Sequence, residues 1–294
     1  TGSIGVNIRH DFSDKLKVYG SYSYGRDDNN TLSESFTEYI GQNLTQDSKS
    51  DNNSVRGNHR LEANLEWNIT DKDYIKITPQ FGYNDNTADN FSNSTYKSNG
   101  LIDNTQLQTS LNNSTSPRYN ISGLYNKRLN DKGRNLFFNF NYDNANTKSD
   151  FNQILDREIF DGANQETAIA DIYEKSLREA QNKSWNAGAS VSFLEPLSAK
   201  SKLEISYDYN TNDYDNADKQ NAFDAAGNSL NDPQLNYNYN YDYGFTTHKV
   251  GASYIFENDK VKYSVGAAVQ PSLLKGNAYS STASAVIDRS NFNI

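Results

Sequence analysis

The chain has 294 residues, a mean hydropathy of −0.89 and a net charge of −9, from 28 Lys and Arg against 37 Asp and Glu. It has no run of about 18 apolar residues, which excludes a transmembrane helix, and its acidic balance without a cationic cluster argues against a nucleic-acid partner. Zero cysteines exclude disulfides and thiol metal sites and fit an oxidising envelope compartment.

Five short polar turns divide the chain. They contain Lys15, Lys72, Lys132, Lys200 and Lys260, so successive turns are 57, 60, 68 and 60 residues apart. Each turn joins two segments of alternating apolar and polar residues, each about 9–11 residues long, which is the length a tilted strand needs to cross a bilayer. Long Asn/Asp/Ser-rich loops separate the pairs. The pattern predicts an all-β fold, an antiparallel transmembrane β-barrel of the outer-membrane type with about ten strands in this chain.

The two faces of the predicted strands differ in chemistry. After the turns, residues of one parity are uncharged, as in Leu16, Ile77, Phe138 and Ile205, and we expect them to face lipid. Lys127 is the one cation on this face of the incoming strands, close enough to a turn to reach the interface. The opposite parity is polar, and its expected lumen-lining residues include Glu62, Glu66, Gln80, Asn139 and Glu204. Because only alternate residues meet lipid, a low mean hydropathy is expected.

Aromatic residues recur at a fixed distance from the turns. Four outgoing strands end their apolar parity with a pair, namely Tyr22 and Tyr24, Phe81 and Tyr83, Phe140 and Tyr142, and Tyr207 and Tyr209. The last tyrosine follows Lys15, Asp73, Arg134 and Lys200 by 9, 10, 8 and 9 residues, which predicts a girdle at the water interface. Trp67, Trp185, Phe193 and Phe256 are expected to form the opposite girdle near the turns. Ordinary aromatic packing in a soluble β-sandwich is the alternative.

Two of the long segments carry further patterns. Between about Asp150 and Gln181, seven residues from Ala168 to Ala180 follow i, i+3, i+4 spacing, which predicts a short amphipathic helix. The segment from Asp208 to Asp218 begins like a calcium loop, but Asp213 stands where Gly is needed and Lys219 where Glu is needed. A solvated loop is the preferred interpretation, and we expect no metal and no cofactor.

A row of tyrosines is the main candidate ligand site. Tyr237, Tyr239, Tyr241 and Tyr243 share one parity, opposite to the membrane parity of the strand that follows. In an unbroken strand they face the lumen and can stack on a sugar or another planar ligand. A bulge at Gly244 would instead turn them outward.

No catalytic motif occurs in the sequence, and we expect no enzyme activity. His10, His59 and His248 lack metal or nucleophile spacing and are interpreted as strand-end residues near an interface.

Ser190 to Asn212, with Glu195-Pro196-Leu197 at its turn, resembles the outer-membrane β-barrel family of TonB-dependent-receptor-like proteins common in Bacteroidetes. Residues 60–85 and 8–24 are also similar to that family. Membership implies a barrel of about twenty-two strands, a plug domain and a TonB-like energy transducer as a partner. Since the chain begins almost directly in a strand and has no methionine, we expect residues 1–294 to be part of one barrel domain within a longer polypeptide.

The leading hypothesis is a transport barrel in the outer membrane of a Gram-negative bacterium, importing an unidentified ligand. Its expected partners are outer-membrane lipid and lipopolysaccharide, with a surface lipoprotein as a further candidate. The alternatives are a barrel that anchors a surface or secretion complex, a soluble extracellular carbohydrate-binding β-protein, and a closed ten-strand barrel.

Overall fold

The computed structural model describes residues 1–162, 164–280 and 283–293, and the regular elements within them are eleven β-strands. They are β1 (Gly2–Asp11), β2 (Leu16–Tyr39), β3 (Leu44–Thr70), β4 (Asp73–Ser98), β5 (Leu101–Arg128), β6 (Asn135–Asp161), β7 (Asn164–Pro196), β8 (Ser201–Phe223), β9 (Tyr237–Glu257), β10 (Lys262–Tyr279) and β11 (Ser284–Asn293). The described residues contain no helix that could span a bilayer. The predicted all-β class is therefore confirmed, with eleven strands in place of ten.

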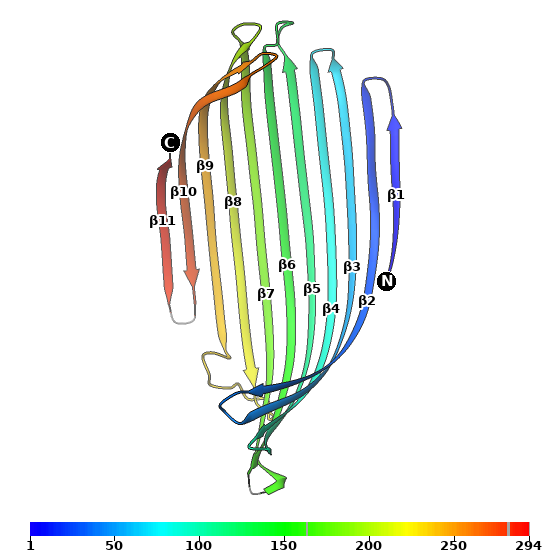
Figure 1. The fold of residues 1–294 in the computed structure, drawn as a ribbon, viewed down its shortest axis with the longest axis vertical. Coiled ribbons are helices and arrows are strands. Elements are labelled where there is room, and N and C mark those ends of the chain that lie inside the picture. Colours follow the sequence, from blue (N-terminus) through cyan, green and yellow to red (C-terminus); the bar gives the residue numbers. More distant parts are fainter. Residues whose placement is uncertain (163, 281–282, 294) are drawn as a thin grey trace.

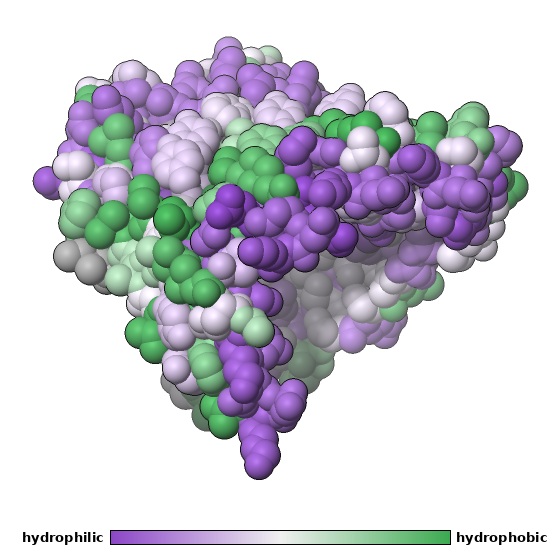
Figure 2. Space-filling model, turned by 90° about the horizontal axis from the view of Figure 1, so that it is seen from above, coloured by the Kyte–Doolittle hydropathy of each residue, from purple (hydrophilic) through white to green (hydrophobic). Residues whose placement is uncertain are grey.

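The strands form one antiparallel sheet in which every strand pairs with its neighbours in sequence, from β1 to β11 (Figure 1). Seen from above, the sheet curves around a hollow (Figure 2). β1 and β11 stand at opposite edges and do not pair with each other, so the sheet is not closed. The described chain thus forms neither a two-sheet sandwich nor a closed ten-strand barrel.

Most strands are far longer than the predicted 9–11 residues. β3 has 27 residues and β7 has 33, which at the rise of an extended chain is roughly 90 and 110 Å. The Asn/Asp/Ser-rich segments read as loops are mostly continuations of these strands. The reason is that each segment has an adjacent strand that accepts and donates its backbone hydrogen bonds, which outweighs the low β-propensity of these residues.

Two of these extensions overturn local predictions. Residues 168–180 are not a helix but part of β7, paired with β6 and partly with β8. Their apolar residues are divided between the faces, because the pairing sets Ile172 on one side and Leu177 on the other. The segment from Asp208 to Asp218 is likewise not a loop but part of β8, so Asp213 and Asp215 lie on the opposite face from Asp208, Asn210, Asn212 and Asp218.

All five turns are held by the same local bond. A Ser, Thr or Asn side-chain oxygen accepts a hydrogen bond from the backbone N–H of the lysine two residues later, which rigidifies a tight reversal. The pairs are Ser13 and Lys15 at 3.2 Å, Thr70 and Lys72 at 3.1 Å, Asn130 and Lys132 at 3.0 Å, Ser198 and Lys200 at 3.2 Å, and Asn258 and Lys260 at 2.9 Å. The repeat seen in the sequence is thus a repeat of turn geometry.

The pairing sorts side chains onto two faces, because residues directly opposite each other in adjacent strands share a face. One row crosses nine strands and contains only apolar and aromatic residues: Leu16, Trp67, Ile75, Tyr125, Phe138, Val191, Tyr207, Val250 and Val269. We call the face that carries this row the apolar face and the other the polar face, along the whole sheet.

The apolar face is not covered by any other part of the described chain. Val6, Ile205 and Val265 are 52%, 48% and 68% exposed, and Ala222 is the one buried hydrophobic residue among those described. In Figure 2, hydrophobic residues accordingly gather on the outer flank of the wall. The alternation therefore packs no interior core.

The register is staggered from hairpin to hairpin. The row of apolar residues meets the first residue of β2, Leu16, but the eighth residue of β10, Val269. With the turns at one level, a shift of seven residues over eight strand spacings corresponds to a strand tilt of roughly 30°. Tilt and stagger of this kind are needed to close a sheet into a barrel. The fold is an outer-membrane barrel-like, all-β sheet with an open seam.

Candidate functional site

The polar face carries the residues predicted to line a lumen. Glu62, Glu66, Gln80, Asn139 and Glu204 all lie on it. Each has a polar partner on the same face, and all of these contacts except the one between Glu62 and Asn64 join neighbouring strands. The partners are Asn64, at 3.2 Å, and Gln80, at 3.3 Å, for Glu62; Tyr19, at 2.7 Å, and Lys76, at 3.3 Å, for Glu66; Ser190, at 3.2 Å, for Asn139; and Ser192 for Glu204.

Neutral amides and hydroxyls make up much of the rest of this face. Asn141 donates to Asn186, which donates to Asn210, at 2.9 and 3.2 Å, so one chain of amides spans three strands. Such a wall offers both donors and acceptors to a hydrophilic solute.

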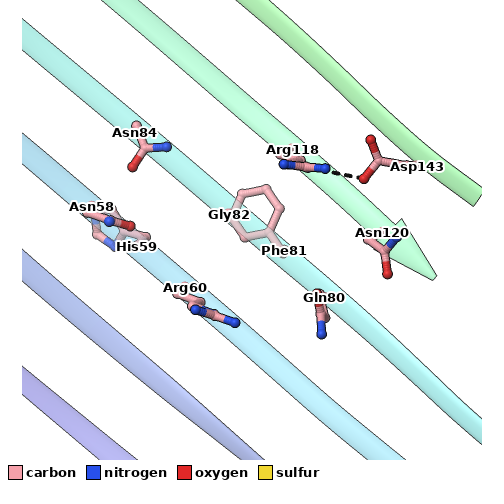
Figure 3. A pocket seen from close by; sticks show the side chains of 10 residues that line it. All are labelled: Asn58, His59, Arg60, Gln80, Phe81, Gly82, Asn84, Arg118, Asn120 and Asp143. Carbon is pink, nitrogen blue, oxygen red and sulfur yellow. Dashed lines mark hydrogen bonds and ion pairs between the residues drawn. The ribbon is translucent and has the colours of Figure 1, made fainter. Parts of the chain in front are cut away.

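A hollow of about 420 Å³ opens on the polar face across β3 to β6 (Figure 3). Arg118 donates to Asp143 at 3.1 Å on one side of it, and Arg60 stands on the other. Gly82 leaves the floor open, since a Cβ there would meet nothing closer than 4.0 Å. Sequence reasoning missed this hollow, although the polar parity of these residues marks them as lining the same face.

The tyrosine row lies on the polar face, beyond the belt. β9 pairs with β8 and β10 in one unshifted register through Gly244, so the bulge alternative is wrong. Tyr237 and Tyr239 stack at 4.9 Å, and Tyr241 and Tyr243 are parallel within 7° at 6.4 Å. Partial burial raises the pKa of Tyr243 above its usual value, so the phenol stays neutral to a higher pH. The row is a rigid aromatic surface on a polar wall.

The predicted girdle residues lie on the apolar face. All three histidines also lie on this face, with His10 near the end of β1, whereas His59 and His248 occupy equivalent places: Tyr22 is 2.8 Å from His59 Nδ1, and Tyr207 is 2.9 Å from His248 Nδ1. Both are in mid-strand and not at strand ends, because the strands continue outward. Phe81 also packs against Tyr119 at 5.0 Å.

Trp185 lies at the other end of the apolar belt from the predicted place. It pairs with Asn144 and Asp213, beyond Tyr142 and Tyr209, whereas Trp67 pairs with Leu16 beside a turn. The two tryptophans therefore mark opposite ends of the belt. The error came from treating every residue of an incoming strand as close to its turn.

One ion pair beside the turns joins Lys127 to Asp73. Lys127 lies 3.1 Å from Asp73, which also accepts from Tyr125 at 2.7 Å and Thr70 at 2.6 Å. The hydrogen bond from Thr70, then those from Tyr125 and Lys127, lowers the pKa of Asp73 to about 2. Lys127 thus gains a carboxylate partner as well as its reach toward water.

The Glu195-Pro196-Leu197 turn contributes a second pair. The Arg134 guanidinium binds Glu195 through two nitrogens, at 2.5 and 2.6 Å, and this bond lowers the pKa of Glu195. A bidentate contact of this kind joins two adjacent turns.

No group of three or more His, Cys, Asp or Glu side chains is placed to hold a metal within the described ranges. Asp215 and Asp218, two carboxylates of the segment that begins like a calcium loop, are paired with Lys183 and Arg178. The calcium interpretation has no support in this geometry.

No protein-family model and no curated protein matches the chain. Among solved structures, the chain aligns with the alcaligin outer membrane receptor FauA from Bordetella pertussis at 8% identity, over 99% of this chain and 67% of that one, with a TM-score of 0.15.

Proposed function

We propose that this chain forms part of the wall of an outer-membrane transport barrel that resembles a TonB-dependent receptor and imports a small ligand without bond chemistry. The observation that carries this proposal is the uncovered apolar face. It runs from the turns to the tyrosine pairs and backs onto a hydrophilic face. An uncovered surface of this extent would favour aggregation in water, whereas lipid would solvate it.

Outer-membrane lipid is the partner this face requires. Belts of Tyr and Trp at both ends, with Trp67 at one and Trp185 at the other, match the amphipathic rings that gather at the two lipid–water interfaces. The long strand extensions beyond Tyr24, Tyr83, Tyr142 and Tyr209 then project from the cell, where lipopolysaccharide would surround their base.

The polar face becomes the lumen lining in this arrangement. Its amides and hydroxyls would replace solvent around a hydrophilic ligand in transit, and the aromatic row would meet the ligand at the outer mouth. The plug, the energy transducer and the remaining strands of a barrel of about twenty-two are inferred from the family resemblance.

Deletion of the gene tests the transport role. We expect uptake of at least one small hydrophilic nutrient to fall, measured by growth on a panel of single carbon and iron sources. The wild-type gene should restore it. Unchanged growth on every source, with the protein present in the outer membrane of the complemented strain, would contradict transport.

One observation favours the second function, an anchor for a surface complex. Phe91, Leu107, Leu111, Ile154 and Leu177 cluster on the apolar face of β4 to β7, well beyond the aromatic belt. Phe91 is 46% exposed there. A surface lipoprotein could bind this cluster. Photo-crosslinking from Leu111 in cells would capture such a partner, and deletion would release it from the surface without altering uptake.

A further inference from the structure

The tyrosine row borders a slot on the polar face that has an apolar lining. Two rows of paired residues cross β9, β10 and β11: Tyr243, Gly276 and Ile287 in one, and Tyr241, Ala278 and Ala285 in the other. In the first row both outer side chains are bulkier than the central glycine, and in the second row the tyrosine is bulkier than the two alanines. Tyrosine rings therefore form one wall, Ile287 and Ala285 the other, and Gly276 and Ala278 the floor of a hollow of about 460 Å³.

The width of the slot suits one flat ring. The backbones of β9 and β11 lie two strand spacings apart, about 10 Å. An aromatic system about 3.4 Å thick fills this space in contact with a ring wall on one side and aliphatic groups on the other. Gly276 is required for the opening, because a Cβ there would lie 2.9 Å from the Cβ of Tyr243.

A further tyrosine packs against the tyrosine wall on the side away from the slot. Tyr214 of β8 stacks on Tyr243 at 4.7 Å and 19°, so the side of Tyr243 toward β8 is already occupied. Tyr241 and Tyr243 are 47% and 37% exposed, and Ile287 is 51% exposed. The slot thus presents preformed, accessible apolar surface, with little ordering needed on binding.

The lining disfavours a sugar, which the sequence alone left open. Asp242 and Asn277 belong to the opposite parity and bond to each other at 2.9 Å on the other face. The floor and the far wall therefore offer no side-chain donor or acceptor to a ring of hydroxyls. Binding a sugar there would desolvate its hydroxyls without replacement, a cost that disfavours it.

A cation stands at one end of the slot. Arg289 pairs with Leu274, one row beyond Gly276 and Ile287 on the same face, about 7 Å along the strand. Among the described residues it forms no ion pair, whereas Lys275 beside it pairs with Asp288 on the opposite face. From a backbone position one row away, the long arginine side chain can reach a carboxylate attached to the ring.

We propose that this slot binds a planar aromatic anion, with its ring against Tyr241 and Tyr243 and its carboxylate toward Arg289. This inference rests on the proposed function, because it names the class of ligand that the outer mouth of the transport barrel would bind. Binding itself can be measured without transport.

Equilibrium dialysis of the detergent-purified protein tests the proposal, with tritiated indole-3-acetate as the probe and empty micelles as the blank. Saturable binding is expected, with at least tenfold weaker binding of cyclohexylacetate, which is puckered, and of maltotriose. Ala278→Leu fills the slot and Tyr243→Ala removes its wall, so each should weaken binding at least tenfold. Tyr96→Ala, on the polar face of β4, is the matched control and should bind as wild type.

Arg289→Gln should weaken indole-3-acetate binding at least fivefold but leave neutral indole unchanged. Heat-modified migration on gels verifies that each variant folds, and Ala278→Ser should retain binding. Equal affinity for cyclohexylacetate, tyrosine-dependent binding of maltotriose or indifference to Ala278→Leu would overturn the proposal. If the protein binds the probe but cells take up no nutrient through it, the transport function is contradicted and the ligand site is not. If cells take up a nutrient but the protein does not bind the probe, the ligand site is contradicted and the transport function is not.

Discussion

Asp73 shows how one residue can secure a turn. Its carboxylate accepts from Thr70, Tyr125 and Lys127, and the pKa is lowered from 3.8 to about 2. Because the folded state holds the ionised form more strongly, the stabilisation is complete above the unfolded value of 3.8 and is lost as the pH falls through 2.

Asp73→Asn should therefore lower the thermal midpoint in micelles at pH 7, and the difference from wild type should shrink as the pH falls from 4 to 2. Asp71→Asn, in the same turn, is the control and should leave the midpoint unchanged. A difference that is constant down to pH 2 would rule out the ionised carboxylate as its source.

For single residues, the sequence predicted the face of the sheet on which a side chain lies but not the side chain that it contacts. Alternation was enough to assign Glu62, Glu66 and Gln80 to the polar face, because a strand has only two sides. It could not show that Lys127 meets Asp73, since residues 54 positions apart are brought together by register alone. The position of Trp185 was missed for the same reason.

A glycine of β5 packs against a phenylalanine ring of β6. Gly123 lies directly opposite Phe140, whose ring covers it, and a Cβ at this glycine would fall 2.0 Å from the ring. Gly123→Ala should displace the ring and destabilise the sheet by about 1–3 kcal/mol, the usual range for overpacking. Urea unfolding followed by tyrosine and tryptophan fluorescence measures this.

Gly82→Ala in β4 is the matched control, since its added Cβ has open space. Equal destabilisation by the two substitutions would mean that the loss reflects backbone conformation and not contact with Phe140.

The extended β7 makes a separate prediction, because a strand and a helix expose residues with different periods. Single cysteines at positions 172 to 180 should react with a water-soluble maleimide at rates that follow the exposure of each strand position, slowly at Ser176, which is 5% exposed, and faster at Leu177 on the opposite face, at 37%. Reaction rates with a period near 3.6 residues would restore the helix that the structure replaces.

The extents of the strands were less predictable than their existence. Within the belt, lipid on one side and polar groups on the other enforce alternation, so the crossings are visible in the sequence. Beyond Tyr83 or Tyr142 both faces are wet, and a strand of Asn, Ser and Asp has the composition of a loop. Such a segment becomes a strand because adjacent strands form backbone hydrogen bonds with it, and amino-acid composition does not reveal that pairing.

The whole molecule is a single curved and staggered sheet with two unpaired edges. Its stability as a wall depends on pairing of those edges, because exposed ladder groups invite association. The candidate site was only partly foreseen at this scale: the tyrosine row was visible, but the slot depends on Gly276 and Ile287, which are adjacent only through the order of β9, β10 and β11.

The most direct test of the two-faced wall is a spin-label accessibility scan of β6 in lipid bilayers. The chain has no cysteine, so single cysteines at Phe138, Asn139, Phe140 and Asn141 can be labelled without background. Labels at Phe138 and Phe140 should collide with oxygen, which concentrates in lipid, and those at Asn139 and Asn141 with a water-soluble nickel chelate. Labels that are immobile and shielded from both reagents at Phe138 and Phe140 would place these rings in a dry protein core and contradict the account.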